Sequence, residues 1–209
     1  MRYFEVYSIN LGVDFDWTLA FERPQESSFE QNNLLGTLPD LSQSYQITFD
    51  VNLNAGSHNP STQNFRSILF LTSTGNNCCS PGDRIPAIFY RPSDGAVSIG
   101  QTRHDGTENA YNTQYGGYTT YNPLPEQEWH TFKVQQILNS DGTAALIAYI
   151  GGYGYYAGIV DVPQAFTNVN IYAGNPWMEP ANGSIRNLEI RIGGKYDQNE
   201  RWFITLITF

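Results

Sequence analysis

Residues Glu126–Gly152, with the sequence EQEWHTFKVQQILNSDGTAALIAYIGG, decide the fold of this chain. Apolar and polar side chains alternate over residues 131–135, and a second regular run occupies residues 144–150. An alternation with period two is typical of β-strands, whose successive side chains point to opposite faces. The Asp141-Gly142 pair between the runs is typical of a tight turn, because glycine adopts positive φ without strain. The pattern predicts a long antiparallel hairpin, and its second strand, apolar on both faces, is expected inside a sheet rather than at an edge.

The composition fits an all-β protein. Among 209 residues there are 14 Tyr, 12 Phe, 4 Trp and 19 Gly, whereas only 15% of the residues are charged. Aromatic residues favour pleated sheets, and glycines favour turns. The formal net charge of −9 argues against nucleic acid as a partner, because the phosphate backbone carries the same sign. An acidic balance is also compatible with calcium binding.

The expected cellular location rests on the apolar stretches of the sequence and on its first residues. No stretch approaches the roughly 20 apolar residues that span a bilayer, so no membrane insertion is expected. The chain begins Met-Arg-Tyr-Phe-Glu-Val-Tyr, which indicates a strand rather than a signal peptide. A cytosolic protein and a mature secreted chain without its leader both stay open. The tyrosine-rich, lysine-poor composition favours the second, so we expect a secreted or extracellular protein.

Further apolar or alternating runs predict strands along the whole chain. They occupy residues 3–9, 16–22, 44–53, 67–72, 84–90, 96–100, 159–162, 169–174, 184–192 and 202–209. No run has the period of a helix longer than a turn or two. About a dozen strands without helices predict one antiparallel β-sandwich of jelly-roll type, a single domain over residues 1–209. The expected core residues are Phe49, Leu69, Phe70, Ile88, Phe132, Leu146, Ile171 and Leu188.

Five segments in a fixed order carry a family resemblance. They are Leu34–Leu38, Tyr45–Val51, the strand Trp129–Val134 with its hairpin, Val169–Ala173, and Gly183–Ile190, which begins Gly-x-Ile-x-Asn-Leu. In this order the chain resembles the concanavalin A-like lectin/glucanase superfamily, in particular its laminin G-like and pentraxin-like animal members. The resemblance covers about residues 34–192 and implies the jelly-roll fold. It does not select a function, because the superfamily includes lectins, hydrolases and adhesion modules.

The carboxylate pattern leads us to expect a protein that is not an enzyme. The resemblance implies that laminarinase-like members carry two glutamates and an aspartate at alternating positions on one strand, which places the acid and the nucleophile on one face. Here the pairs Asp14/Asp16 and Glu126/Glu128 each lack a third carboxylate. A glycan hydrolase or lyase with an atypical site stays open as a minor alternative.

Residues Gln101–Pro125 form the longest segment without a strand pattern, and they contain the best candidate for a metal site. Asp105, Glu108 and Asn109 offer the carboxylate and amide oxygens that calcium prefers. Acidic residues beside glycine are also common turn formers, so a turn without metal is the alternative. If the chain binds calcium, we expect these three residues to be its ligands.

Two further features of the sequence concern covalent chemistry. Cys78 and Cys79 are adjacent and surrounded by turn-forming residues, so they cannot join distant strands. A disulfide between the two neighbours, disulfides to other chains and free thiols in an exposed loop all stay open. Asn182 begins an Asn-Gly-Ser sequon, which predicts N-glycosylation if the chain is secreted.

Aromatic residues in segments expected to be loops suggest the function. They are Tyr115, Tyr118, Tyr121, Tyr153, Tyr155, Tyr156 and Trp177. Aromatic rings stack on the C–H faces of sugars, and tyrosine hydroxyls satisfy sugar hydroxyls. We therefore expect an extracellular lectin-like, non-catalytic module that binds glycan or a cell-surface glycoprotein. The alternative is a structural or adhesion protein whose Tyr/Gly loops and cysteine pair join copies of the chain into a homo-oligomer.

Overall fold

The computed structural model describes residues 17–77, 80–101, 124–151, 153–160 and 163–193, and for residues 153–159 it describes the backbone alone. These residues form twelve strands and no helix. The strands are β1 (Trp17–Arg23), β2 (Ser27–Ser28), β3 (Leu34–Leu41), β4 (Tyr45–Leu53), β5 (Arg66–Thr72), β6 (Ala87–Arg91), β7 (Ala96–Gly100), β8 (Trp129–Leu138), β9 (Ala144–Ile150), β10 (Tyr153–Val160), β11 (Phe166–Ala173) and β12 (Gly183–Gly193). Over these ranges, the chain contains no helix that is long and apolar enough to cross a membrane.

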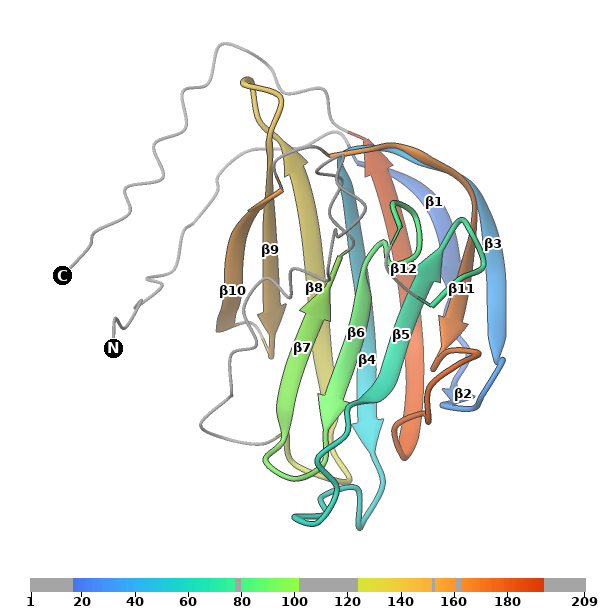
Figure 1. Cartoon of the computed structure of the whole chain (residues 1–209), viewed down its shortest axis with the longest axis vertical. Helices are drawn as coiled ribbons and strands as arrows, with labels where there is room; N and C mark the ends of the chain where they lie inside the picture. Colours follow the sequence, from blue (N-terminus) through green and yellow to red (C-terminus); the bar gives the residue numbers. More distant parts are fainter. Residues whose placement is uncertain (1–16, 78–79, 102–123, 152, 161–162, 194–209) are drawn as a thin grey trace, which may run out of the picture.

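Two antiparallel sheets form the layers of a sandwich (Figure 1). The larger, seven-stranded sheet has the order β1-β12-β4-β8-β9-β10, with β2 also paired to β12. The smaller, five-stranded sheet has the order β3-β11-β5-β6-β7. Strands far apart in the sequence lie side by side in both sheets, which is the jelly-roll arrangement that the sequence predicts. Whether residues 1–209 form a single domain stays a prediction, because the described residues are only part of the chain.

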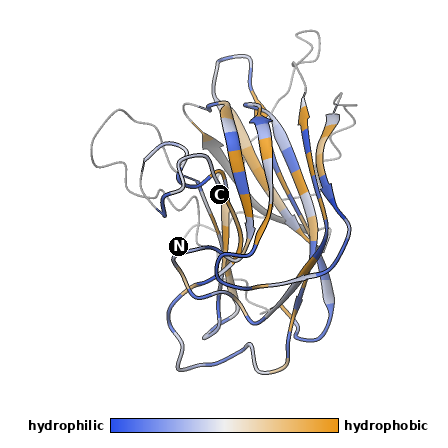
Figure 2. Cartoon of the chain, turned by 90° about the vertical axis from the view of Figure 1, so that its right-hand side faces the viewer, coloured by the Kyte–Doolittle hydropathy of each residue, from blue (hydrophilic) through white to orange (hydrophobic). Residues whose placement is uncertain are grey.

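The core lies between the sheets and follows from the alternation along each strand. In β4 the residues Tyr45, Ile47, Phe49, Val51 and Leu53 are completely buried, and the residues between them are half-buried. Figure 2 shows the same alternation as hydrophobic and hydrophilic bands along the strands. The Phe49 and Phe132 rings pair across β4 and β8, and their centres are 5.1 Å apart. All eight residues that the sequence assigns to the core are buried.

Phe70 is buried in a different place from the other predicted core residues. It lies with Ala87 and Phe89 in a second cluster, against which Phe65, Tyr172 and Met178 pack. Tyr172 and Phe70 are opposite each other on β11 and β5, on the face of the smaller sheet that points away from the inter-sheet core. An apolar residue on the outer face of a sheet can therefore be buried when a loop covers it.

The organising hairpin is confirmed. β8 and β9 pair in the antiparallel direction, and Gly142 has a φ of 87° in the turn between them. The backbone N–H and the hydroxyl of Thr143 both donate to the Asp141 carboxylate, at 2.9 and 2.7 Å, which closes the turn. β9 lies between β8 and β10, away from the edge, as its two apolar faces predict.

The segment that follows the hairpin corrects one expectation. Tyr153, Tyr155 and Tyr156 are expected in a loop, but they lie in β10, which pairs with β9. Gly151, with a φ of 61°, lets the chain reverse directly after β9. Tyrosine favours strands, and the alternation is hidden because the register shifts between Gly154 and Tyr156.

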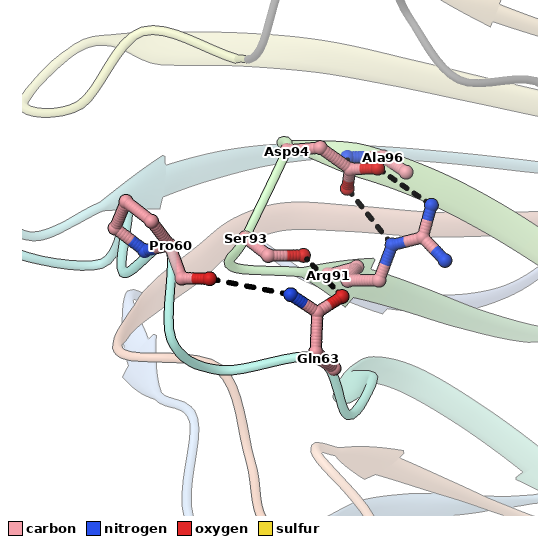
Figure 3. A network of polar contacts seen from close by, with 6 residues as sticks. All are labelled: Pro60, Gln63, Arg91, Ser93, Asp94 and Ala96. Carbon is pink, nitrogen blue, oxygen red and sulfur yellow. Dashed lines mark hydrogen bonds and ion pairs between the residues drawn. The ribbon is translucent and has the colours of Figure 1, made fainter.

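The loop between β4 and β5 is fixed against the turn that joins β6 to β7 (Figure 3). Gln63 donates from its amide to the Pro60 carbonyl at 3.2 Å and accepts from the Ser93 hydroxyl at 3.4 Å. In that turn the guanidinium of Arg91 binds the carboxylate of Asp94 through two hydrogen bonds, of 2.9 and 2.6 Å. These contacts join the β4–β5 loop to the β6–β7 turn at one end of the sandwich.

Candidate functional site

The outer face of the larger sheet carries a continuous set of polar side chains, which we call the polar face. It forms because each inward apolar residue of the central strands alternates with an outward polar one. The register of β12, β4, β8 and β9 brings these outward residues into rows across the sheet. The members are Gln46, Thr48, Asp50, Asn52, Trp129, Thr131, Lys133, Gln135, Tyr149, Ser184, Arg186, Asn187, Glu189 and Arg191.

Asp50 is the centre of the hydrogen bonds on this face. Its carboxylate accepts from the hydroxyl of Thr131 at 2.8 Å and from the side-chain amide of Asn187 at 2.8 Å. The Nε of Arg186 lies 3.4 Å from the same carboxylate. A bulge in β12 makes this possible, because the register against β4 shifts between Arg186 and Glu189 and Asn187 adopts a φ of 52°. Two consecutive side chains of β12 therefore reach one acidic residue.

Arg186 also contacts an aromatic ring. Its guanidinium carbon lies 3.9 Å from the centre of the Trp129 ring, within the range of a cation–π contact. Trp129 is the first residue of β8, two strands away from Arg186. The arginine side chain therefore extends over β4 and is held at both its Nε and its planar face.

Lys133 and Tyr149 form the second feature of the polar face. They are directly opposite each other on β8 and β9, so their Cβ atoms are about 4.5–5.5 Å apart. Partial burial lowers the pKa of the Lys133 ammonium group, and partial burial raises the pKa of the Tyr149 hydroxyl. No acidic residue in the described ranges forms an ion pair with Lys133.

Beyond Lys133 the polar face continues with amides. The amide of Gln135 donates to the amide oxygen of Gln46 at 2.9 Å. Arg191, opposite Gln46 on β12, is ion-paired with Glu189 on its own strand. Lys133 and Tyr149 therefore lie between hydrogen-bonding groups on both sides.

The shifted pKa values give the two groups complementary proton chemistry. A lowered pKa increases the neutral fraction of a lysine amine, which can then accept a proton. A raised pKa keeps a tyrosine hydroxyl protonated, so it can donate one. A base and an acid on neighbouring strands are suited to a reaction that removes a proton from one atom and supplies a proton to another nearby.

The residues that the sequence singles out lie elsewhere. Trp177 packs on Phe70 of the smaller sheet, with ring centres 5.5 Å apart, and is 39% exposed. Asn182 is exposed, and its side chain accepts from the amide of Asn54 at 3.0 Å. Tyr153, Tyr155 and Tyr156 are described only as backbone. Their binding and glycosylation roles stay predictions.

Other candidate residues lie outside the described ranges. They are Cys78, Cys79, Asp105, Glu108, Asn109, Tyr115, Tyr118 and Tyr121. Calcium binding and the states of the cysteine pair stay predictions, as does secretion. Within the described ranges, no group of three or more His, Cys, Asp or Glu side chains is arranged to hold a metal ion.

A second polar cluster lies at the end of the sandwich. The Nε2 of His58 is 2.8 Å from the Leu124 carbonyl, which can only accept, so Nε2 donates to it and Nδ1 accepts from the buried Tyr90 hydroxyl at 2.7 Å. The Glu126 carboxylate accepts from the backbone N–H groups of His58 and Gly56, and these bonds lower the pKa of the carboxyl group. Because His58 is enclosed by these bonds, this cluster fixes the loop that follows β4 rather than presenting free groups.

Comparison with known proteins supports the fold. No protein-family model matches the sequence, and no curated protein matches it. The structure is similar to that of the alginate lyase Aly36B, with a TM-score of 0.53, 17% identity and 82% of each chain covered. It is also similar to a variant of that lyase, with one lysine and one tyrosine replaced by alanine, in complex with an alginate tetrasaccharide (TM-score 0.52, 15% identity, 82% of each chain).

Two further matches have a TM-score of 0.50. The first is the alginate lyase vAL-1 from Chlorella virus, with 9% identity, 87% of this chain and 90% of that chain covered. The second is domain 4 of the extracellular arabinanase AbnA from Geobacillus stearothermophilus in complex with arabinotriose, with 14% identity and 86% and 95% covered. These matches confirm the predicted resemblance to concanavalin A-like sandwiches at the level of the fold.

The expectation of a protein that is not an enzyme is wrong. Structures with this fold include alginate lyases, which are enzymes. The expectation rests on the missing carboxylate pattern of glycosidases, but that pattern is a requirement of hydrolysis. A lyase cleaves by elimination and needs a proton acceptor and a proton donor instead.

Proposed function

We propose that the protein is a polysaccharide lyase that cleaves a uronate-containing polysaccharide on its polar face. The observation that carries the proposal is the pairing of Lys133 and Tyr149 across β8 and β9, with a lowered pKa on the lysine and a raised pKa on the tyrosine. The similarity to alginate lyases supports the reaction class.

The elimination requires two proton transfers close together. The neutral amine of Lys133 removes the proton from the sugar carbon next to the carboxyl group, C5. The electron pair of that C–H bond becomes a double bond between C4 and C5, and the bond from C4 to the glycosidic oxygen breaks. The hydroxyl of Tyr149 gives its proton to the departing oxygen, and water restores both side chains.

The requirement for a uronate follows from this chemistry. The carbon that loses its proton is acidic only when it lies next to a carbonyl group, and a neutral hexose has no such group at C5. The chain as a whole carries a net charge of −9 and repels a polyanion at long range. The guanidinium of Arg186 on the polar face therefore provides the local attraction that binding requires.

Elimination and hydrolysis leave different products. We would incubate the protein with alginate, polygalacturonate and a neutral glucan, and measure both new reducing ends and ultraviolet absorbance. Elimination creates a carbon–carbon double bond conjugated with the carboxyl group, which absorbs, whereas hydrolysis yields reducing ends without new absorbance. Absorbing products from a polyuronate support the proposal. Binding without cleavage, or hydrolysis, contradicts it.

Single substitutions test the two assigned residues. Removing a general acid or base typically costs about 10²–10⁴-fold in rate, and we expect such a loss for Lys133→Met and for Tyr149→Phe. The matched control is Tyr172→Phe, on the outer face of the smaller sheet, which we expect to leave activity unchanged. Full activity in a folded Lys133→Met variant would remove the lysine from the mechanism.

A further inference from the structure

Arg186 is held on the polar face by two contacts that leave the terminal nitrogens of its guanidinium free to bind a ligand. Its Nε contacts Asp50, and its planar face lies on Trp129. Its two terminal nitrogens form no hydrogen bond with any described residue, and the side chain is 38% exposed. The guanidinium is therefore fixed in position while its outer donors remain open to solvent.

Asp50 does not depend on Arg186 for its own hydrogen bonds. Thr131 and Asn187 each donate to its carboxylate at 2.8 Å, and both bonds are shorter than the 3.4 Å contact from Arg186. The carboxylate thus orients the arginine but uses only one of its five donors. An arginine held in this way loses little conformational entropy when it binds a ligand.

We propose that Arg186 binds the carboxylate of an acidic sugar unit of the polysaccharide and makes the polar face selective for acidic over neutral chains. The inference rests on the proposed function, because it places this subsite beside the Lys133–Tyr149 pair. The planar fork of a guanidinium matches the two oxygens of a carboxylate, which a neutral sugar cannot offer.

The spacing along β8 places the Arg186 subsite at a distance from Lys133 that one polysaccharide chain can span. Trp129 and Lys133 are four residues apart on the same face, which corresponds to about 13 Å at the rise of a strand. A polysaccharide lying along β8 can therefore contact Arg186 with one unit while another unit lies over Lys133. Arg191, on the other side of Lys133, also pairs with a carboxylate through its Nε, but it is a weaker candidate because no aromatic ring among the described residues holds its guanidinium in place.

Binding measurements can separate this subsite from catalysis. We would titrate a uronate oligosaccharide, and the same oligosaccharide after reduction of its carboxyl groups, into the Lys133→Met protein by calorimetry. Arg186→Gln in this background is expected to weaken binding of the acidic form by about ten- to a hundredfold, the size of a charge-assisted hydrogen bond, and to leave the reduced form unchanged. Arg186→Lys keeps the charge without the fork and should be intermediate.

Arg91 supplies the matched control. It also combines a carboxylate partner with an aromatic ring, Asp94 and Phe65, but it lies at the β6–β7 turn (Figure 3). Arg91→Gln is expected to leave the affinity for both oligosaccharides unchanged. Thermal melting of each variant establishes that it is folded.

The outcomes distinguish the subsite from the reaction. Cleavage by the wild type, together with equal affinity of the acidic form in a folded Arg186→Gln variant, overturns the subsite and leaves the lyase standing. Tight acidic binding that is lost in Arg186→Gln, without cleavage by the wild type, supports the subsite and overturns the lyase. No binding of the acidic form to the wild type overturns both.

Discussion

Replacement of Gly183 by alanine tests the close packing of β12 against β4. A Cβ at this position would lie 2.1 Å from the Asn52 carbonyl oxygen and 3.0 Å from the Leu53 Cα. Both contacts are with backbone, so no side chain can rotate away to relieve them. Gly183 lies opposite Leu53 in the ladder, and the two central strands would have to separate at this end of the polar face.

The magnitude follows from the nature of the clash. Overpacking a well-packed site costs about 1–3 kcal/mol, and we expect the upper end because the neighbours are backbone atoms. For a protein of this size 1 kcal/mol corresponds to about 2–4 °C, so the melting temperature should fall by about 6–12 °C.

Gly100→Ala is the matched control. Among the described residues, its new Cβ would meet nothing closer than the Phe89 ring at 3.6 Å and the Ala87 carbonyl at 3.8 Å, which are ordinary contacts. Its melting temperature should stay within about 2 °C of the wild type. The measurement is differential scanning calorimetry of the three proteins in one buffer. Equal melting temperatures for Gly183→Ala and Gly100→Ala would refute the packing argument.

Three further outcomes are expected. The rate of cleavage should rise with pH on the alkaline side of neutrality, because the neutral amine of Lys133 is the base and its pKa is lowered. The rate should fall again where Tyr149 loses its proton. Lys133→Arg should abolish the rising limb of the pH–rate profile. Tyr90→Phe should lower the free energy of unfolding by about 1 kcal/mol in urea denaturation, because Nδ1 of His58 loses its donor. Tyr45→Phe should be neutral or stabilising in the same assay, because the buried Tyr45 hydroxyl has no hydrogen-bond partner among the described residues. A comparable loss of unfolding free energy in Tyr90→Phe and Tyr45→Phe would contradict this difference between the two hydroxyls.

The fold could be predicted from the sequence wherever burial imposed an uninterrupted alternation. The hairpin and β4 are examples, since each inward residue meets the core and each outward residue does not. Of β10 only the end is predicted, by the strand expected at residues 159–162, because the bulge at residues 154–156 breaks the period of the tyrosine-rich part, and glycine and tyrosine together are also typical of loops. A strand next to a tight turn therefore needs more than local pattern to be recognised.

The candidate site was hidden for a different reason. A lysine that alternates with apolar residues on a strand normally faces solvent, and the sequence offers no sign that Lys133 is half-buried beside Tyr149. The bond between Asp50 and Asn187 joins residues 137 positions apart. The alternation did show that Lys133 lies opposite the core, so its face could be predicted, whereas its neighbours depended on the order of strands in the sheet.

The bulge in β12 makes the length of this strand adjustable at one position. Asn187 is the extra residue, and its removal would leave Arg186 outward and Leu188 inward in an unbroken ladder with β4. Loss of a residue farther along the strand would instead turn the remaining side chains onto the opposite face. A natural or engineered form that lacks Asn187 should thus keep its core while Asp50 loses one donor, so the hold on Arg186 can be loosened by a deletion that the sandwich tolerates.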